Sequence, residues 1–179
     1  RRTDVARPTI FVGAATCGLS AGADKTLAAL NDHVAAQRLG ADVVTVGCLG
    51  ICSEEPLVDV QLPGRTRGVF RRVTAEAAPA LIDAVLAGAI PDGAALGQHR
   101  DPAQRPWDGV PFLDEHPFFA PQTRWVLANC GVIAPASIEQ YIALGGYAAR
   151  ANALSTMSPD QVCDVVEQSG LRGRGGGGF

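Results

Sequence analysis

Three cysteines in the first third of the chain could hold a metal. Cys17 follows a short apolar run, and Cys48 and Cys52 flank three residues in a predicted turn between two strands. A [2Fe–2S] cluster needs four thiolates, two on each iron, and the fourth would stand about five residues from Cys17. Val12 and Gly22 occupy those two positions, and neither can ligate. We therefore expect a cluster-type scaffold that has lost a ligand, in which a [2Fe–2S] cluster is unlikely, and we assign no metal ligand.

Other uses of the cysteines are no better supported. A zinc site would need a further ligand close by, and His33 is predicted in the middle of a helix on another element. Five cysteines is an odd number, which argues against a disulfide framework. Cys130 and Cys163 are interpreted as small core residues. We expect partly buried thiols and a reducing, cytoplasmic compartment.

A second candidate site is the glycine-rich stretch SGLRGRGGGGF at residues 169–179. Glycines allow positive φ, so consecutive N–H groups can turn toward an anion. Arg172 and Arg174 add charge suited to phosphate. The stretch is neither a GxxxxGK[ST] loop nor a GxGxxG after a strand, and it follows a predicted helix. From the residues alone, a phosphate-binding loop and a flexible linker both stay open.

The elements that must position the three cysteines are predicted within about 90 residues. Apolar runs indicate four strands, at residues 9–13, 42–46, 56–62 and 68–73, and apolar periodicity indicates helices at 20–38 and 74–88. The first strand, helix and second strand form a unit whose strands should be parallel. The loops after these strands then lie at one sheet edge, where the three thiols could converge. Pro63 and Gly64 make a hairpin of the next two strands. The order β-α-β-β-β-α predicts a thioredoxin-like α/β domain.

Residues 91–124 contain six prolines, which exclude a long helix or a central strand. We expect an extended connector that lies along a partner surface or a second domain, docked by its aromatic residues Trp107, Phe112, Phe118 and Phe119. A strand at residues 124–127 and short helices at 137–144 and 147–154 are predicted next. Ser158 through Gln161 (SPDQ) is typical of a helix start with a capping box.

Composition narrows the function classes. The chain has 179 residues, of which 47% are hydrophobic and 18% charged, as expected for a folded chain. Its net charge of −3 offers no footprint for nucleic acid. No apolar run approaches the roughly 18 residues of a membrane span, so direct membrane insertion is not expected.

Two sets of residues resemble one family. The stretch NCGVIAPASIEQYIALGGYAA followed by SGLRGRGGGGF resembles the start of the flavoprotein subunit of NADH dehydrogenases. That family includes the NADH-oxidising subunit of complex I and its counterparts in NAD-reducing and bifurcating hydrogenases and NAD-dependent formate dehydrogenases. VGAATCGLSAGA and GCLGICSEEPLVDVQLPG resemble the thioredoxin-like ferredoxin domain fused ahead of that subunit. The expected domains are a degenerate ferredoxin domain at 1–90, the connector at 91–124, and the truncated helical start of an FMN/NADH-binding domain at 125–179.

The resemblance implies cofactors and partners. Gly173, Arg174 and Gly175 would line FMN, and Gly176 and Phe179 would approach NADH; no catalytic residue is expected in this chain. NADH would pass a hydride to FMN, and electrons would leave through iron–sulfur clusters, with [4Fe–4S] ligands beyond residue 179. Partners would be NAD(H), a ferredoxin-like small subunit and a hydrogenase or formate dehydrogenase catalytic subunit. We expect this fragment alone to be inactive. The alternative function is a non-catalytic, thioredoxin-like docking module.

Overall fold

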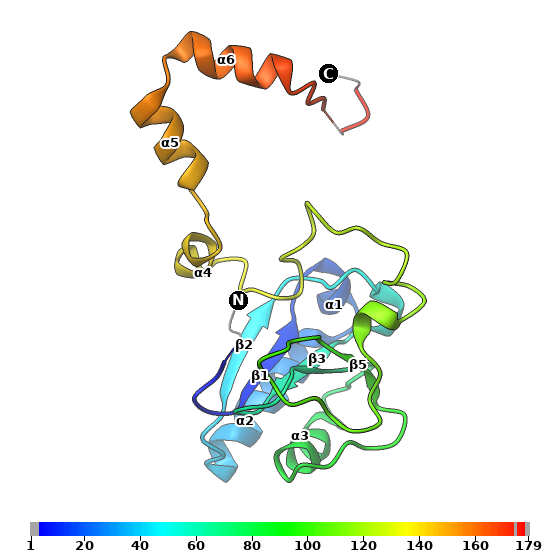
Figure 1. Cartoon of the computed structure of the whole chain (residues 1–179). Helices are drawn as coiled ribbons and strands as arrows, with labels where there is room; N and C mark the ends of the chain where they lie inside the picture. Colours follow the sequence, from blue (N-terminus) through cyan, green and yellow to red (C-terminus); the bar gives the residue numbers. More distant parts are fainter. Residues whose placement is uncertain (1–3, 174, 178–179) are drawn as a thin grey trace. The chain divides into compact units, whose positions relative to one another are not determined.

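The computed structural model describes residues 4–173 and 175–177, and its elements fall into two units, residues 1–137 and residues 138–179 (Figure 1). The first unit contains β1 (Thr9–Gly13), α1 (Thr16–Ser20), α2 (Ala23–Gln37), β2 (Asp42–Val46), the 3₁₀ helix η1 (Cys52–Glu54), β3 (Val58–Gln61), β4 (Gly68–Phe70), α3 (Ala78–Leu86), β5 (Ala95–Gln98) and the 3₁₀ helix η2 (Leu113–Glu115). The second contains α4 (Ile138–Ala143), α5 (Ala148–Thr156) and α6 (Pro159–Gln168).

One mixed sheet has the strand order β2-β1-β3-β4-β5. β1 and β2 are parallel, while β3, β4 and β5 each run antiparallel to the strand before them in the sheet. The order 2-1-3-4, with the first two strands parallel, is the thioredoxin-like topology predicted from the sequence. The predicted α/β fold is confirmed, and β5 extends the sheet by an edge strand.

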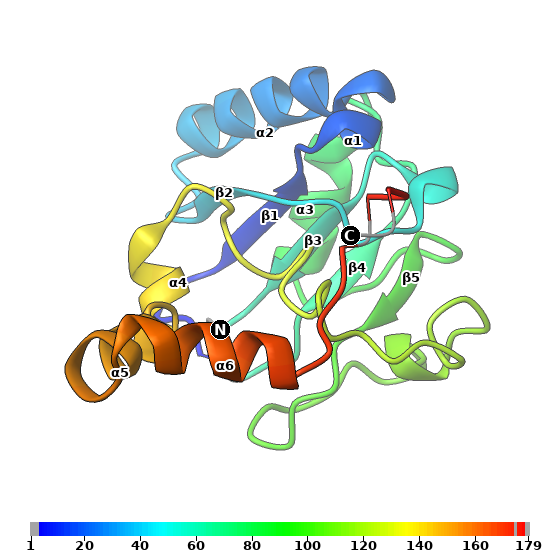
Figure 2. The same cartoon turned by 90° about the horizontal axis from the view of Figure 1, so that it is seen from above.

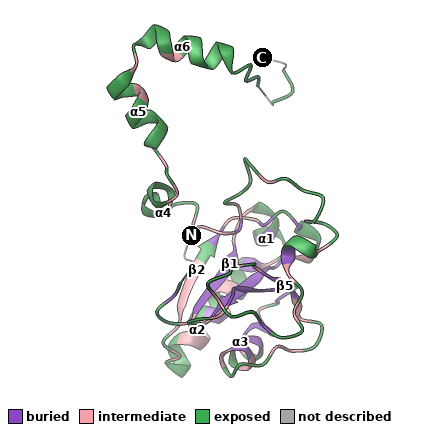
Figure 3. Cartoon of the chain, viewed as in Figure 1, coloured by how far each residue is buried: buried purple, intermediate pink, exposed green. Residues whose placement is uncertain are grey.

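One face of the sheet is covered by α2 and α3, which both pack against it (Figure 2). Side chains alternate between the two faces of a strand, so Ile10 and Val60, which are opposite each other in the β1–β3 register, point to the same side. Both are fully buried in a cluster with Leu30 of α2 and Ile82 of α3. Figure 3 shows this burial concentrated on the central strands. The two predicted helices have periodic apolar residues because one side of each helix is buried against this face of the sheet.

The other face is covered by the proline-rich segment itself. Phe119 packs there in a second cluster with Val69 and Leu113, while Phe118 remains 41% exposed. The segment was expected to lie on a partner surface or second domain; instead it docks on the sheet of its own unit. The reason is that the second face of the sheet is also apolar, so that the chain buries it within one unit.

The buried amide of Gln98, at the end of β5, holds another part of the proline-rich segment, in which Trp107 and Val110 pack in the first cluster. Its Oε1 accepts from the Trp107 backbone N–H (2.7 Å), and its Nε2 donates to the carbonyls of Trp107 (3.0 Å) and Val110 (2.6 Å). Trp107 is only 4% exposed. Because β5 is an edge strand of four residues, it is compatible with the prolines around it.

The predicted strand at residues 124–127 is wrong. The segment forms turns, with the Ala128 N–H donating to the Trp125 carbonyl at 3.3 Å. Trp125 and Val126 are 86% and 94% exposed, so the apolar run has no sheet to join.

The short helices of the second unit are confirmed as α4 and α5. The predicted capping box at the start of α6 is also confirmed, with Ser158 accepting from the Gln161 N–H and the Gln161 side chain accepting from the Ser158 N–H. No helix in the described part of the chain is long and apolar enough to cross a membrane.

Candidate metal centre

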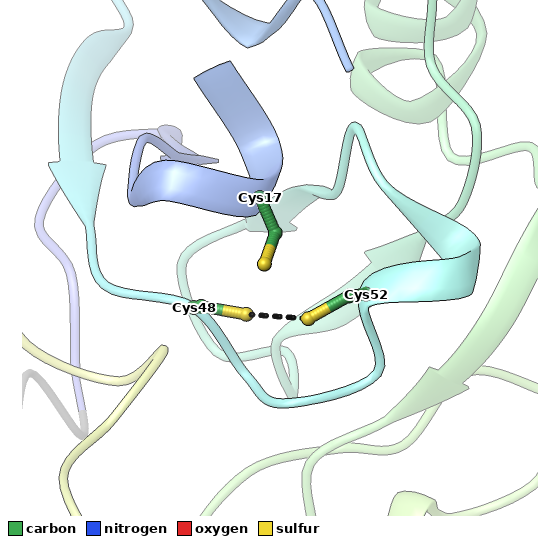
Figure 4. A group of neighbouring side chains, drawn as sticks. All are labelled: Cys17, Cys48 and Cys52. Atoms are coloured by element: carbon green, nitrogen blue, oxygen red, sulfur yellow. Dashed lines mark hydrogen bonds between the residues drawn. The ribbon is translucent and has the colours of Figure 1, made fainter. Parts of the chain in front are cut away.

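Three cysteine thiols converge at one edge of the sheet. Cys17 belongs to α1, just after β1; Cys48 lies in the loop after β2; and Cys52 begins η1. Figure 4 shows the three side chains pointing toward one another, and all three sulfur atoms lie within 4.8 Å of each other. They meet because β1 and β2 are parallel, so the segments that follow the two strands both start at the carboxyl end of the strands. The predicted convergence is confirmed.

The loop between Cys48 and Cys52 is shaped to hold two sulfur atoms close together. Their Sγ atoms are 3.7 Å apart, and Cys48 Sγ accepts a hydrogen bond from the Gly50 N–H at 3.2 Å. Gly50 has φ +107°, which favours glycine, so the loop can turn back within three residues. Two thiolates bound to one tetrahedral metal ion, at about 2.3 Å each, lie about 3.8 Å apart. The spacing therefore suits two ligands of a single metal atom.

The thiols are more accessible than the sequence suggested. Cys17 and Cys52 are exposed, and Cys48 is half-buried. Hydrogen bonding to Cys52 raises the pKa of Cys17, and burial raises the pKa of Cys48. The expectation of partly buried thiols is confirmed for Cys48 and wrong for Cys17 and Cys52. The expectation that a cluster is unlikely is corrected by the gathering of the three thiols within 4.8 Å of each other. That reasoning required a fourth cysteine at a set spacing from Cys17, whereas the structure gathers three accessible or half-buried thiols from α1, the loop after β2 and η1.

Glu55 is a component of the site that sequence reasoning missed. Its side chain follows Cys52 by three residues and is buried, with the residue only 7% exposed. Oε2 accepts a hydrogen bond from the Leu57 N–H at 2.7 Å, and Oε1 is buried without a hydrogen-bond partner among the described residues. Burial raises the pKa of this carboxyl group, which also interacts with the Cys48 thiol. A glutamate directly before a proline and just after a cysteine pair was the available signal.

Residues 128–133 of the same unit press against the cysteine loop. A Cβ on Gly131, which has φ +76°, would lie 2.8 Å from the Leu49 Cα, so this approach needs glycine. The carbonyls of Gly131 and Val132 accept hydrogen bonds from the buried Arg67 guanidinium at 2.7 and 2.9 Å. These bonds hold the segment over the sheet edge that carries the thiols.

The two remaining cysteines are not part of the three-thiol group in the portion of the chain that the structure describes. Cys130 is half-buried, and Cys163 is exposed on α6. The interpretation of Cys163 as a core residue is therefore wrong. The reason is that no residue of α6 is buried, so its apolar face has no core to join.

The glycine-rich loop stays a prediction. Gly173, Gly175 and Gly176 are exposed, and Gly176 has φ +92°. Arg174 and Phe179, which were also predicted to bind cofactor, lie outside the described residues.

Comparison with known proteins gives partial matches. No family model matches the chain. The HndC component of the NADP-reducing hydrogenase of Solidesulfovibrio fructosivorans is 57% identical over 58 residues, which are 32% of this chain and 12% of HndC. HndB from the same organism is 35% identical over 74 residues, covering 41% of this chain and 59% of HndB. An NADH-quinone oxidoreductase subunit of Aquifex aeolicus (strain VF5) is 54% identical over 43 residues, covering 24% of this chain and 10% of that protein.

A solved structure gives a weaker likeness. The thioredoxin-like [2Fe–2S] ferredoxin from Aquifex aeolicus superposes with a TM-score of 0.47 at 15% identity, covering 56% of this chain and all of the ferredoxin. The thioredoxin-like fold is accordingly established by the strand order described above. The chain spans about a tenth of the length of HndC and of the quinone oxidoreductase subunit, and less than two thirds of HndB. It is thus a homologue, over part of its length, of subunits of NADH-quinone oxidoreductases and NADP-reducing hydrogenases.

Proposed function

We propose that this chain is part of a subunit of an NAD(P)H-dependent oxidoreductase that exchanges a hydride between NAD(H) and FMN and passes electrons to iron–sulfur clusters. The observation that carries the proposal is the 57% identity to HndC over 58 residues, together with the match to the quinone oxidoreductase subunit. Those relatives are named as subunits of NADP-reducing hydrogenase and NADH-quinone oxidoreductase. Other subunits of such a complex are the proposed partners.

We assign the binding of FMN to the glycine-rich loop. Gly173, Arg174 and Gly175 would hold the flavin and its phosphate, while Gly176 and Phe179 would face NADH. Glycines permit the close approach of a flat ring system to backbone N–H groups, and the guanidinium supplies fixed positive charge toward phosphate. The flavin supplies the hydride chemistry, and the protein orients it.

The three-thiol group is proposed as an iron–sulfur site. Thiolates are the ligands of such clusters, and Cys48 and Cys52 already have a separation suited to one tetrahedral iron. A cluster supplies one-electron transfer when it is bound. The exposed Cys17 and Cys52 place the site at the surface of its unit, where a redox partner can approach it.

The test uses the complete subunit with its native partner subunits. Visible absorbance of the purified complex reports FMN, and NADH addition under nitrogen reports its reduction. We expect Gly175→Val to remove FMN, because a Cβ would intrude on the flavin, while Cys163→Ser on the exposed α6 keeps it. Wild-type flavin occupancy in Gly175→Val would show that the loop is not the flavin site.

A further inference from the structure

The three thiols leave an iron–sulfur cluster one protein ligand short, since clusters of the [2Fe–2S] and [4Fe–4S] types take four. A further anionic group beside them is the carboxylate of Glu55. Its residue is only 7% exposed in its own unit, and Oε1 has no hydrogen-bond partner among the described residues. An ionised carboxylate buried in this way is costly unless it pairs with a cation or coordinates a metal.

No arginine or lysine forms an ion pair with Glu55 in the described part of the chain. The arginines that approach this region are used by other acids: Arg72 pairs with Glu54 at 3.1 Å, and Arg67 pairs with Asp59. Within the described residues, Glu55 therefore has the Leu57 N–H on Oε2 but no cation and no hydrogen-bond donor on Oε1, the oxygen that a metal would partner.

The position of Glu55 connects it to both thiol-bearing loops. If Gly13 carried a Cβ, that atom would lie 3.3 Å from Glu55 Oε2, and a Cβ on Gly18 would lie at the same distance. Gly18 directly follows Cys17, so the carboxylate lies against the turn that carries this thiol. On the other side, the carboxyl group interacts with the Cys48 thiol. The absence of side chains at the two glycines is what leaves room for the carboxylate there.

We propose that Glu55 is the fourth ligand of this site, so that Cys17, Cys48, Cys52 and Glu55 hold an iron–sulfur cluster through three thiolates and one carboxylate. The inference rests on the proposed function, because it assumes that the thiols bind a cluster. Coordination by iron removes the cost of burying the charged carboxylate and gives its free oxygen a partner. A carboxylate is a harder ligand than a thiolate, so the cluster carries a mixed oxygen and sulfur coordination.

The test reconstitutes the 179-residue chain anaerobically with ferrous iron and sulfide. Iron and sulfide per chain, the absorption spectrum, the electron paramagnetic resonance of the reduced state and the rate of iron release to a chelator are measured. The variants are Glu55→Ala, which removes the ligand, and Glu55→Cys, which restores four thiolates. Glu54→Gln is the matched control, because Glu54 lies in the same 3₁₀ turn but contacts Arg72 instead.

We expect wild type and Glu54→Gln to hold the same cluster, and Glu55→Ala to release iron at least tenfold faster. Glu55→Cys retains a cluster with a changed absorption and resonance spectrum, which a purely structural role for Glu55 would not produce. If both Glu55 variants show the wild-type spectrum and release rate, Glu55 is not a ligand, and the proposed cluster itself survives. If wild type binds no more iron than Cys52→Ser, the cluster and the ligand assignment both fail.

Discussion

Replacing Arg67 by methionine should destabilise the first unit strongly. The guanidinium is buried, donates to Asp59 Oδ2 at 2.7 Å and to two carbonyls of residues 131–132, and lies 3.7 Å from the centre of the Phe11 ring. Methionine keeps much of the side-chain length but leaves the Asp59 charge buried without its cation. Breaking a buried pair in this way costs about 3–5 kcal/mol. At about 3 °C per kcal/mol, the melting temperature should fall by roughly 10–15 °C.

The assay is urea and thermal unfolding followed by circular dichroism at neutral pH. Arg7→Met is the matched control, because its ion pair with Asp42 is on the surface and should be worth about 1 kcal/mol or less. The double variant Arg67→Met with Asp59→Leu should recover most of the lost stability, since it removes both charges. The reasoning is refuted if Arg67→Met is no less stable than Arg7→Met, or if the double variant is less stable than Arg67→Met alone.

Three further predictions concern the site and its surroundings. Cys52→Ser should lose most of its iron after reconstitution while Cys163→Ser retains it; equal loss in both would contradict the assigned site. Gly18→Ala should lower the free energy of unfolding by about 2–3 kcal/mol, because a Cβ would overlap the carbonyl oxygen at the end of β1, and denaturant titration measures this. Hydrogen bonding to the Arg100 guanidinium holds the pKa of Asp114 below its ordinary 3.8. The ionised Asp114 therefore stabilises the fold at pH values above its ordinary pKa, and this stabilisation is lost as the pH falls through its lowered pKa. The difference in unfolding free energy between wild type and Asp114→Asn should accordingly shrink on acidification below about pH 4. A difference that grows would contradict the prediction.

Much of the framework could be predicted from local patterns. The four strands of the thioredoxin-like order, the long helix after the first strand and the start of α6 follow from side-chain period, turn residues and the capping box. Even the meeting of Cys17 with Cys48 and Cys52 followed from the rule that parallel strands end at one edge. These features depend on residues that are near each other in the chain. The exception is the β-α-β crossover, which joins parallel strands and is almost always right-handed.

The tertiary structure decided the rest. Whether the run at 124–127 becomes a strand depends on a free neighbouring edge, and whether residues 91–124 lie on a partner or on their own sheet depends on which apolar face is uncovered. The burial of Glu55 beside the thiols depends on two glycines, far from it in the chain, that leave it room. A short sequence pattern does not show which distant residues become neighbours in the fold. The burial of a side chain depends on those neighbours, whereas the periodicity of apolar residues can be read from the local sequence. The candidate thiols were therefore visible in the sequence, while the carboxylate that we propose completes their site became visible only in the folded chain.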